Sequence, residues 1–256
     1  MLDSRLKKPA QACVLVATLL SVLFFPLPFG RLGTVNLVPM QNGNASYPIV
    51  AVFGDSVASQ YLPYLSESLS GCMIVYYLAE PGRQSLARLM LDKSWVPANA
   101  RGAENLAYII SQQWDQQLDF AIFNVGLHDV KAVGPQHNIT FAIDAYRANL
   151  RRVFSVLGVT AENVGFVATT PVVEGVAPGS FSNAMISEFN LAAQSESGLQ
   201  GASFIDTYTP LSAWESDLFA SDGYHLSELG SQRMSEHIKG YLLQEIESKG
   251  RSLDCE

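Results

Sequence analysis

The sequence IVAVFGDSV at residues 49–57 joins five consecutive apolar residues to a Gly-Asp-Ser turn. An apolar run without polar alternation is typical of a strand that is buried on both faces of a parallel sheet. Gly54 permits a sharp turn, and Asp55 or Ser56 can cap a following helix. The stretch therefore predicts a βα unit with Ser56 at the carboxyl end of its strand.

The same alternation of short apolar runs and amphipathic stretches continues along the chain. It predicts βαβ units and a parallel five-stranded sheet covered by helices on both faces, in a single domain over residues 48–247. The predicted strands are 49–53, 73–78, 120–125, 164–169 and 203–206. The predicted helices are 57–70, 103–113, 139–157, 182–196 and 228–247.

Composition and charge exclude several classes of protein. With 256 residues, 48% of them hydrophobic and 16% charged, the chain is neither disordered nor collagen-like nor a coiled coil. Residues 32–256 hold 12 basic and 23 acidic side chains, a net charge of −11. A surface this acidic repels phosphate backbones, so we expect no nucleic-acid partner.

An apolar segment precedes the domain. Residues 12–29 contain no charge and follow Arg5, Lys7 and Lys8, which is typical of a signal anchor or a cleaved signal peptide. We expect an uncleaved anchor over residues 1–29, a linker over 30–47 and a C-terminal tail over 248–256. The basic residues favour a cytosolic N-terminus, so the domain is expected on the non-cytoplasmic side, membrane-anchored or secreted.

The three cysteines, Cys13, Cys72 and Cys255, lack the paired spacing of a zinc site. Cys72 and Cys255 could form a disulfide if the domain lies outside the reducing cytosol. The sequence leaves open whether their Cα atoms come within bonding range.

Polar groups follow the predicted strands at the edge where a parallel sheet binds its ligands. Besides Ser56, these are Gly82 after the second strand, GLHD at residues 126–129 after the third, and DGYH at residues 222–225 before the last helix. A carboxylate three residues before a histidine can orient the imidazole. Each motif alone also fits a helix cap or a polar turn. The acidic and histidine residues lack metal-ligand spacing, so neither a metal nor another cofactor is expected.

Together these four motifs resemble the SGNH hydrolases, the GDSL-type esterases and lipases. That superfamily has GDS, a glycine, G-x-N-D and D-x-x-H in this order, and the resemblance spans about residues 48–245. It implies a three-layer α/β/α, flavodoxin-like fold. It also implies Ser56 as nucleophile, His225 as general base and Asp222 as its orienting carboxylate, with an oxyanion hole formed by Ser56, Gly82 and His128.

One residue departs from the pattern: His128 stands where the superfamily has asparagine. A protonated ring nitrogen can also donate a hydrogen bond, so His128 is expected to keep the oxyanion role. The G-x-H-D variant is similar to the third motif of some PC-esterase relatives.

The substrate pocket is expected to include Asp129, Thr170 and Trp214. Thr170 follows the fourth predicted strand, and Trp214 lies in the loop before Asp222, where it could stack on a sugar or simply pack beneath the loop. The short insertions between elements favour a small acyl group such as acetyl.

The function predicted from these residues is an exported serine esterase acting on an acyl ester of a glycan, a lipid or another small molecule. A glycan O-acyltransferase would use the same triad but would need an acceptor site that excludes water. A catalytically weakened glycan-binding domain is the third hypothesis. His128 in place of asparagine favours it, whereas the intact Ser56, Asp222 and His225 argue against it.

Overall fold

The computed structural model describes residues 36–41, 43–79, 102–110, 117–133, 139–212, 216–253 and 255. The predicted anchor at residues 1–29 lies outside these ranges. Within them, no helix is both long enough and apolar enough to cross a membrane.

A six-stranded sheet with the order β1-β3-β2-β4-β5-β6 forms the centre of the domain. All neighbouring strands are parallel except β1 and β3. The five predicted parallel strands are present, with ends shifted by a few residues. The strands are β1 (Asn36–Pro39), β2 (Ile49–Gly54), β3 (Ile74–Ala79), β4 (Leu118–Asn124), β5 (Ala161–Val167) and β6 (Ser203–Ile205).

The sixth strand, β1, corrects the predicted count of five. It lies within the stretch that was expected to be a linker, and it pairs antiparallel with β3 from Asn36↔Ala79 to Pro39↔Tyr76. Four residues ending in proline give no periodic signal, and proline is tolerated there because the strand is at the edge of the sheet. The strand exists because β3 offers it a partner.

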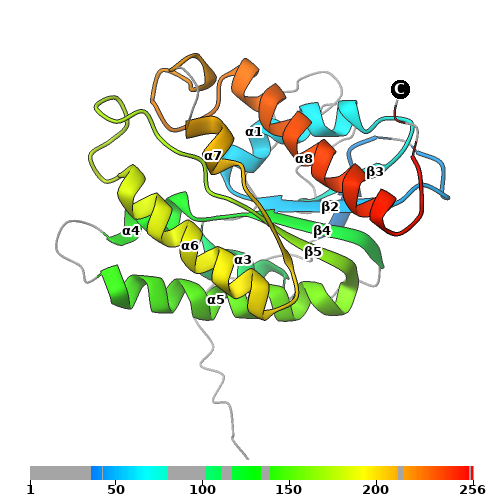
Figure 1. Ribbon diagram of the computed structural model, residues 1–256, viewed down its shortest axis with the longest axis horizontal. Helices are drawn as coiled ribbons and strands as arrows, with labels where there is room; N and C mark the ends of the chain where they lie inside the picture. Colours follow the sequence, from blue (N-terminus) through cyan, green and yellow to red (C-terminus); the bar gives the residue numbers. More distant parts are fainter. Residues whose placement is uncertain are drawn as a thin grey trace, which may run out of the picture. The chain divides into compact units, whose positions relative to one another are not determined.

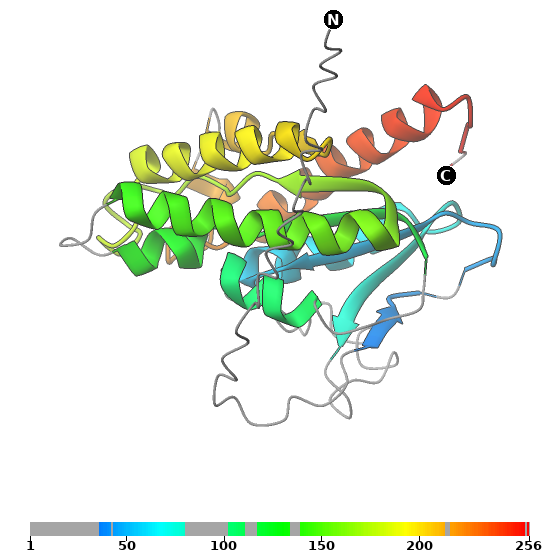
Figure 2. The same cartoon turned by 90° about the horizontal axis from the view of Figure 1, so that it is seen from below.

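Helices cover both faces of the sheet, which confirms the three-layer α/β/α architecture (Figure 1). Helices α1 and α8 pack together on one face, whereas α3, α5 and α6 lie on the other (Figure 2). Helix α4, at the end of β4, was not predicted. The helices are α1 (Ser56–Ser68), α3 (Ala103–Ile110), α4 (Leu127–Val133), α5 (Ile139–Thr160), α6 (Asn183–Leu199), α7 (Tyr208–Ser212), the 3-10 turn η1 (Ser216–Leu218) and α8 (Glu228–Ser248).

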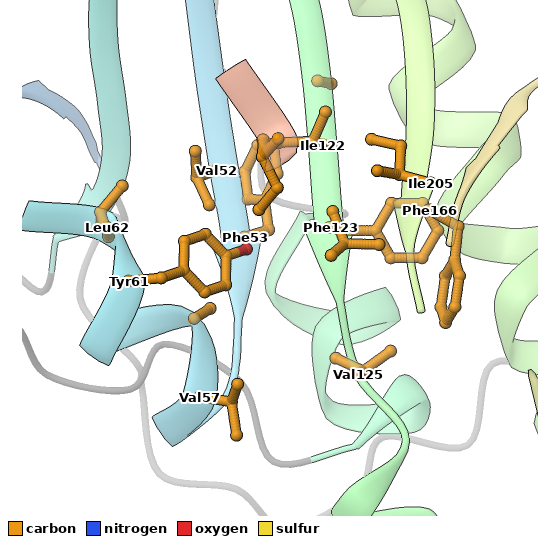
Figure 3. Packing of buried hydrophobic residues seen from close by; sticks show 14 of the residues in the cluster. Val52, Phe53, Val57, Tyr61, Leu62, Ile122, Phe123, Val125, Phe166 and Ile205 are labelled. Atoms are coloured by element: carbon orange, nitrogen blue, oxygen red, sulfur yellow. The ribbon is translucent and has the colours of Figure 1, made fainter. Parts of the chain in front are cut away.

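The central strands are buried, as their continuous apolar runs predict (Figure 3). In β2 and β4, Phe53 lies beside Phe123 in the parallel register. The Phe123 ring meets those of Phe154 and Phe166 edge-on, with centroids 5.1 and 5.2 Å apart. This packing gives the strand ends a rigid support.

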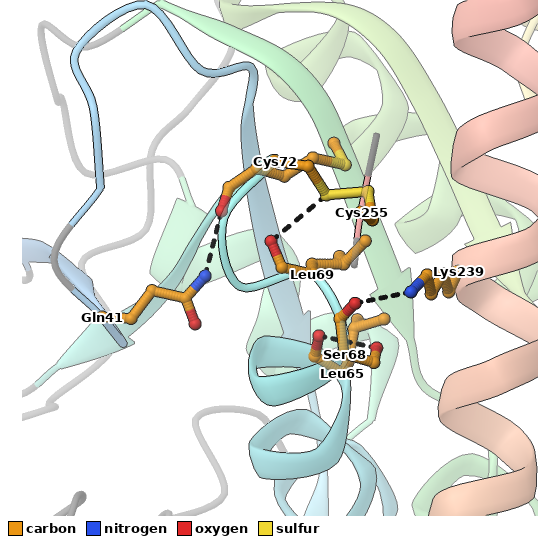
Figure 4. The surroundings of a disulfide bond; sticks show 8 residues. Gln41, Leu65, Ser68, Leu69, Cys72, Lys239 and Cys255 are labelled. Atoms are coloured by element: carbon orange, nitrogen blue, oxygen red, sulfur yellow. Dashed lines mark hydrogen bonds between the residues drawn. A yellow bond between two sulfur atoms is a disulfide. The ribbon is translucent and has the colours of Figure 1, made fainter. Parts of the chain in front are cut away.

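A disulfide joins Cys72, between α1 and β3, to Cys255 near the C-terminus (Figure 4). Their Cα atoms are 5.1 Å apart although 183 positions separate them in the sequence. The pairing that the sequence left open is therefore formed. It ties the predicted tail back to the domain.

The strand order changes direction at β2, which gives the sheet a topological switch point between β2 and β4. The chain passes from β2 outward to β3 and then returns to β4 on the other side of β2. At such a switch point the connections after the two neighbouring strands leave toward opposite faces and open a space between them. The turns that follow β2 and β4 lie at this switch point.

Candidate active site

The turn after β2 places Ser56 as the first residue of α1. Asp55 is the N-cap: its Oδ1 accepts a hydrogen bond of 3.0 Å from the Val57 backbone N–H. A Cβ on Gly54 would lie 2.6 Å from the Asn124 carbonyl oxygen, so only glycine lets the ends of β2 and β4 approach this closely. Ser56 itself remains partly exposed at the N-terminus of a helix.

Three predicted catalytic residues form a continuous hydrogen-bonded chain. His225 Nε2 lies 2.7 Å from Ser56 Oγ, although 169 positions separate the two residues. His225 Nδ1 lies 2.6 Å from Asp222 Oδ2. With the proton on Nδ1, the imidazole donates to the carboxylate and its Nε2 can accept the Ser56 hydroxyl proton.

The carboxylate of Asp222 is kept ionised by its own turn. Burial alone would raise its pKa, but hydrogen bonds from the His225 backbone, the His225 ring and the Tyr224 backbone lower the pKa below the usual value. Asp222 Oδ1 accepts the backbone bonds from Tyr224 and His225 at 3.2 and 3.0 Å. Gly223 adopts the positive φ of 75° that lets the turn close so tightly.

One aromatic ring packs against the imidazole of His225, and a second ring packs against the first. The ring centroid of Tyr224 lies 4.3 Å from that of His225, at an interplanar angle of 38°. Phe181 packs in turn on Tyr224, with centroids 5.0 Å apart. This stack limits the rotation of the imidazole, and the face of an aromatic ring favours a nearby cation.

The motif after β4 begins helix α4 and contains His128 and Asp129 in its first turn. Both carboxylate oxygens of Asp129 lie 3.1 Å from the Ala103 backbone N–H, the first of α3. Burial raises the pKa of Asp129 to about 7, although the Ala103 N–H counteracts part of this effect. Asp129, predicted to bind substrate, thus contacts the start of another helix. His128 is partly exposed, at the switch point.

The other predicted site residues are placed differently. Thr170 is only 1% exposed, and its hydroxyl has no hydrogen-bond partner within the described ranges. Gly82 and Trp214 lie outside the described residues. A depression of about 180 Å³ lies between the chain after β5 and the segment before Asp222. Its lining consists of Pro171, Val172, Val173, Asn183, Leu211, Ser212, Ser216 and Phe219.

Some supporting residues were missed by the sequence analysis. Asn124 donates from Nδ2 to the carbonyl oxygens of Val167 and Ala168 at 2.9 and 3.2 Å, joining the ends of β4 and β5. The Asn190 carboxamide makes two 2.9 Å bonds to the backbone of Thr169. A polar residue closing a buried strand was the available signal for Asn124. Asn190 gave none, because its partner is 21 positions away.

Within the described part of the chain, no group of three or more His, Cys, Asp or Glu side chains is arranged to hold a metal ion. Around Ser56, the described residues bring together a hydroxyl, an imidazole that faces a carboxylate, and the N-terminus of a helix. These are the components of nucleophilic acyl transfer.

The sequence matches no protein-family model and no curated protein. Solved structures do match. A lipase/acylhydrolase from Enterococcus faecalis superposes with a TM-score of 0.58 at 15% identity, covering 82% of this chain and 98% of that one. A protein from Slackia heliotrinireducens, provisionally assigned to the SGNH hydrolases, has a TM-score of 0.53 at 20% identity, with coverages of 77% and 100%.

A third similar structure is a catalytic mutant of an acetylxylan esterase from Geobacillus stearothermophilus. Its TM-score is 0.53 at 12% identity, over 75% of this chain and 92% of that one. At these identities the likeness shows a shared fold. It is the fold implied by the four sequence motifs.

Proposed function

We propose that this chain, which has the fold of the SGNH hydrolases, is a serine esterase that removes a small acyl group from a glycan or lipid ester. The main support is the chain of hydrogen bonds from Ser56 through His225 to Asp222, at 2.7 and 2.6 Å. A serine needs an adjacent, oriented base to become nucleophilic near neutral pH, and this geometry supplies one.

In the proposed reaction, Ser56 Oγ attacks the ester carbonyl carbon while His225 Nε2 takes the hydroxyl proton. Asp222 stabilises the imidazolium that forms. The tetrahedral intermediate collapses, and the alcohol leaves with the proton from His225. Water then attacks the acyl-serine, again passing a proton to Nε2. The carboxylic acid leaves as Ser56 Oγ regains that proton.

We assign the oxyanion to three donors, of which Ser56 and His128 lie in the described residues. The Ser56 N–H is the first of helix α1, where backbone donors have no partner within the helix. The Gly82 N–H and the His128 ring complete the proposed set. A single such donor contributes about 3 kcal/mol to the transition state.

The acyl group is proposed to be small. We propose the depression of about 180 Å³ as its pocket. Val173 in the lining donates from its backbone N–H to the Gly223 carbonyl oxygen at 2.7 Å, which connects the depression to the turn that contains Asp222. One of the structural neighbours is an acetylxylan esterase, which makes an acetylated glycan the first substrate to test.

Export is part of the proposal. The Cys72–Cys255 disulfide favours an oxidising compartment, because reducing cytosol rarely permits such bonds. The uncharged residues 12–29 are proposed to direct the chain there and to anchor it in the membrane.

The test is hydrolysis of p-nitrophenyl acetate by the full chain in mild detergent. Ser56→Ala is expected to lower kcat by roughly a thousandfold or more, because it removes the nucleophile. Ser68→Ala, at the far end of the same helix, is the matched control and should retain activity. Turnover that persists in Ser56→Ala would contradict the proposed role of this serine.

Longer esters and acetylated xylan then define the substrate. If the folded protein hydrolyses none of them, adding glycan acceptors tests acyl transfer, since the same acyl-serine would then pass its group to a sugar hydroxyl. Glycan binding without either reaction would favour the weakened binding domain.

A further inference from the structure

Gln60 links the helix that contains the nucleophile to the turn that contains the base. It lies four residues after Ser56, and thus on the same side of α1. Its carboxamide makes two hydrogen bonds to one residue, Leu226, which directly follows His225. Gln60 Oε1 accepts from the Leu226 N–H at 2.9 Å, and Nε2 donates to the Leu226 carbonyl oxygen at 3.3 Å.

The backbone of Leu226 needs the Gln60 carboxamide as a partner because, within the described residues, its segment is paired on one side only. On one side the segment forms an isolated antiparallel bridge between Leu226 and Phe219. The bonds there come from the flanking residues, Ala220 N–H to His225 O at 2.8 Å and Ser227 N–H to Leu218 O at 2.9 Å.

The N–H and C=O of Leu226 point away from that bridge, and the residue is only 4% exposed. Buried backbone groups must be hydrogen-bonded. The Gln60 carboxamide takes the place that a neighbouring strand would otherwise fill.

The helices α1 and α8 are held together independently of this contact. Ser235 Oγ donates to the Tyr61 carbonyl oxygen at 2.8 Å, and Lys239 Nζ donates to that of Ser68 at 2.7 Å. These bonds secure helix packing farther along α1. Of these three contacts, the one made by Gln60 lies next to both Ser56 and His225, so its loss should affect their alignment more than the fold.

We propose that Gln60 is a positioning residue that keeps His225 Nε2 within hydrogen-bond distance of Ser56 Oγ. The assignment rests on the proposed serine chemistry, since the alignment matters only if the two groups exchange a proton. A misplacement of about 1 Å between reacting groups can lower a rate by about a hundredfold.

The experiment compares Gln60→Leu and Gln60→Glu with the control Lys239→Met, all in the full chain. For p-nitrophenyl acetate, Gln60→Leu is expected to lower kcat by about tenfold to a hundredfold, with KM within about twofold. Gln60→Glu keeps the acceptor for the Leu226 N–H and should recover part of that loss. Lys239→Met should keep the wild-type kcat. Circular dichroism verifies that each variant is folded.

The rate of Ser56 labelling by an alkyl fluorophosphonate gives a second readout that needs no substrate. Slower labelling of Gln60→Leu than of the wild type and Lys239→Met supports the role. If folded Gln60→Leu turns over substrate and is labelled at the wild-type rates, the proposed role of Gln60 is overturned, whereas the serine chemistry is not. If the wild type neither hydrolyses esters nor labels at Ser56, the serine chemistry itself is overturned, and the positioning role with it.

Discussion

Asp55 has a buried carboxyl group and directly precedes Ser56 in the chain. Asp55 is 2% exposed, and burial raises the pKa of its carboxyl from 3.8 to about 6. The Val57 and Ala58 N–H groups and nearby His225 counteract part of this rise in pKa. A carboxyl whose pKa is higher in the folded state binds its proton more tightly there than in the unfolded chain. Ionising Asp55 therefore costs folding free energy, and this cost grows as the pH rises from about 4 to about 6.

Asp55→Asn should remove that pH dependence while keeping the cap, because asparagine caps helices as well as aspartate. A shift of about two pKa units corresponds to about 3 kcal/mol. We therefore expect the unfolding free energy of the variant to gain about 2–3 kcal/mol relative to wild type between pH 4 and pH 7. Urea unfolding at intervals of one pH unit measures this. Asp206→Asn, at an exposed carboxyl, is the control, and a difference that stays constant with pH would refute the prediction.

At the scale of elements, Asp129 connects two helices that are separate in the sequence. Its carboxylate, in the first turn of α4, accepts the first N–H of α3. Gly102, the residue before Ala103, has a φ of 85°. A Cβ at this position would lie 3.0 Å from Asp129 Oδ2. The close approach indicates that Asp129 stabilises the start of α3, a role distinct from the predicted contact with substrate.

Asp129→Ala separates these two roles. At pH 4, where the raised pKa keeps Asp129 protonated in the folded state, ionisation of this carboxyl adds little to the difference in stability. Loss of the cap costs about 1–2 kcal/mol, so Tm at this pH should fall while KM at pH 7 stays within about twofold. The control is Glu104→Ala, which removes an exposed carboxylate from the first turn of α3. A raised KM at unchanged Tm would instead support substrate binding by Asp129.

For the whole molecule, the Cys72–Cys255 bond constrains the chain between positions 183 residues apart. Closing so long a loop in the unfolded state reduces its entropy and stabilises the fold by about 2–5 kcal/mol. Cys72 follows the C-terminus of α1, whereas Ser56 begins that helix. Because α1 has 13 residues, its N-terminus at Ser56 and its C-terminus near Cys72 lie roughly 20 Å apart. The disulfide is therefore distant from Ser56.

Cys255→Ser should therefore lower Tm and leave esterase kcat unchanged. Thermal unfolding with and without dithiothreitol measures the effect: reductant should lower Tm in the wild type and have no further effect in the variant. Equal melting of the two proteins under oxidising conditions would show that the bond contributes no stability.

Much of the fold, and the residues of the proposed triad, could be predicted because the sequence signals for them are local. The apolar run at residues 49–53 is recognisable from its own composition, and the spacing of Asp222 and His225 suits a turn that orients an imidazole. By contrast, β1 depends on pairing with β3. Its four residues contain no pattern of their own.

Local sequence was enough to predict the succession of strands along the chain, the caps and turns, and the residue types available for chemistry. Tertiary structure alone decided that Ser56 meets His225 across 169 positions, that Gln60 binds Leu226, and that Asp129 binds the start of α3. The physical reason is the range of the interactions. Periodicity and capping act over one or two turns, whereas these contacts form only when the whole sheet and its covering helices are packed.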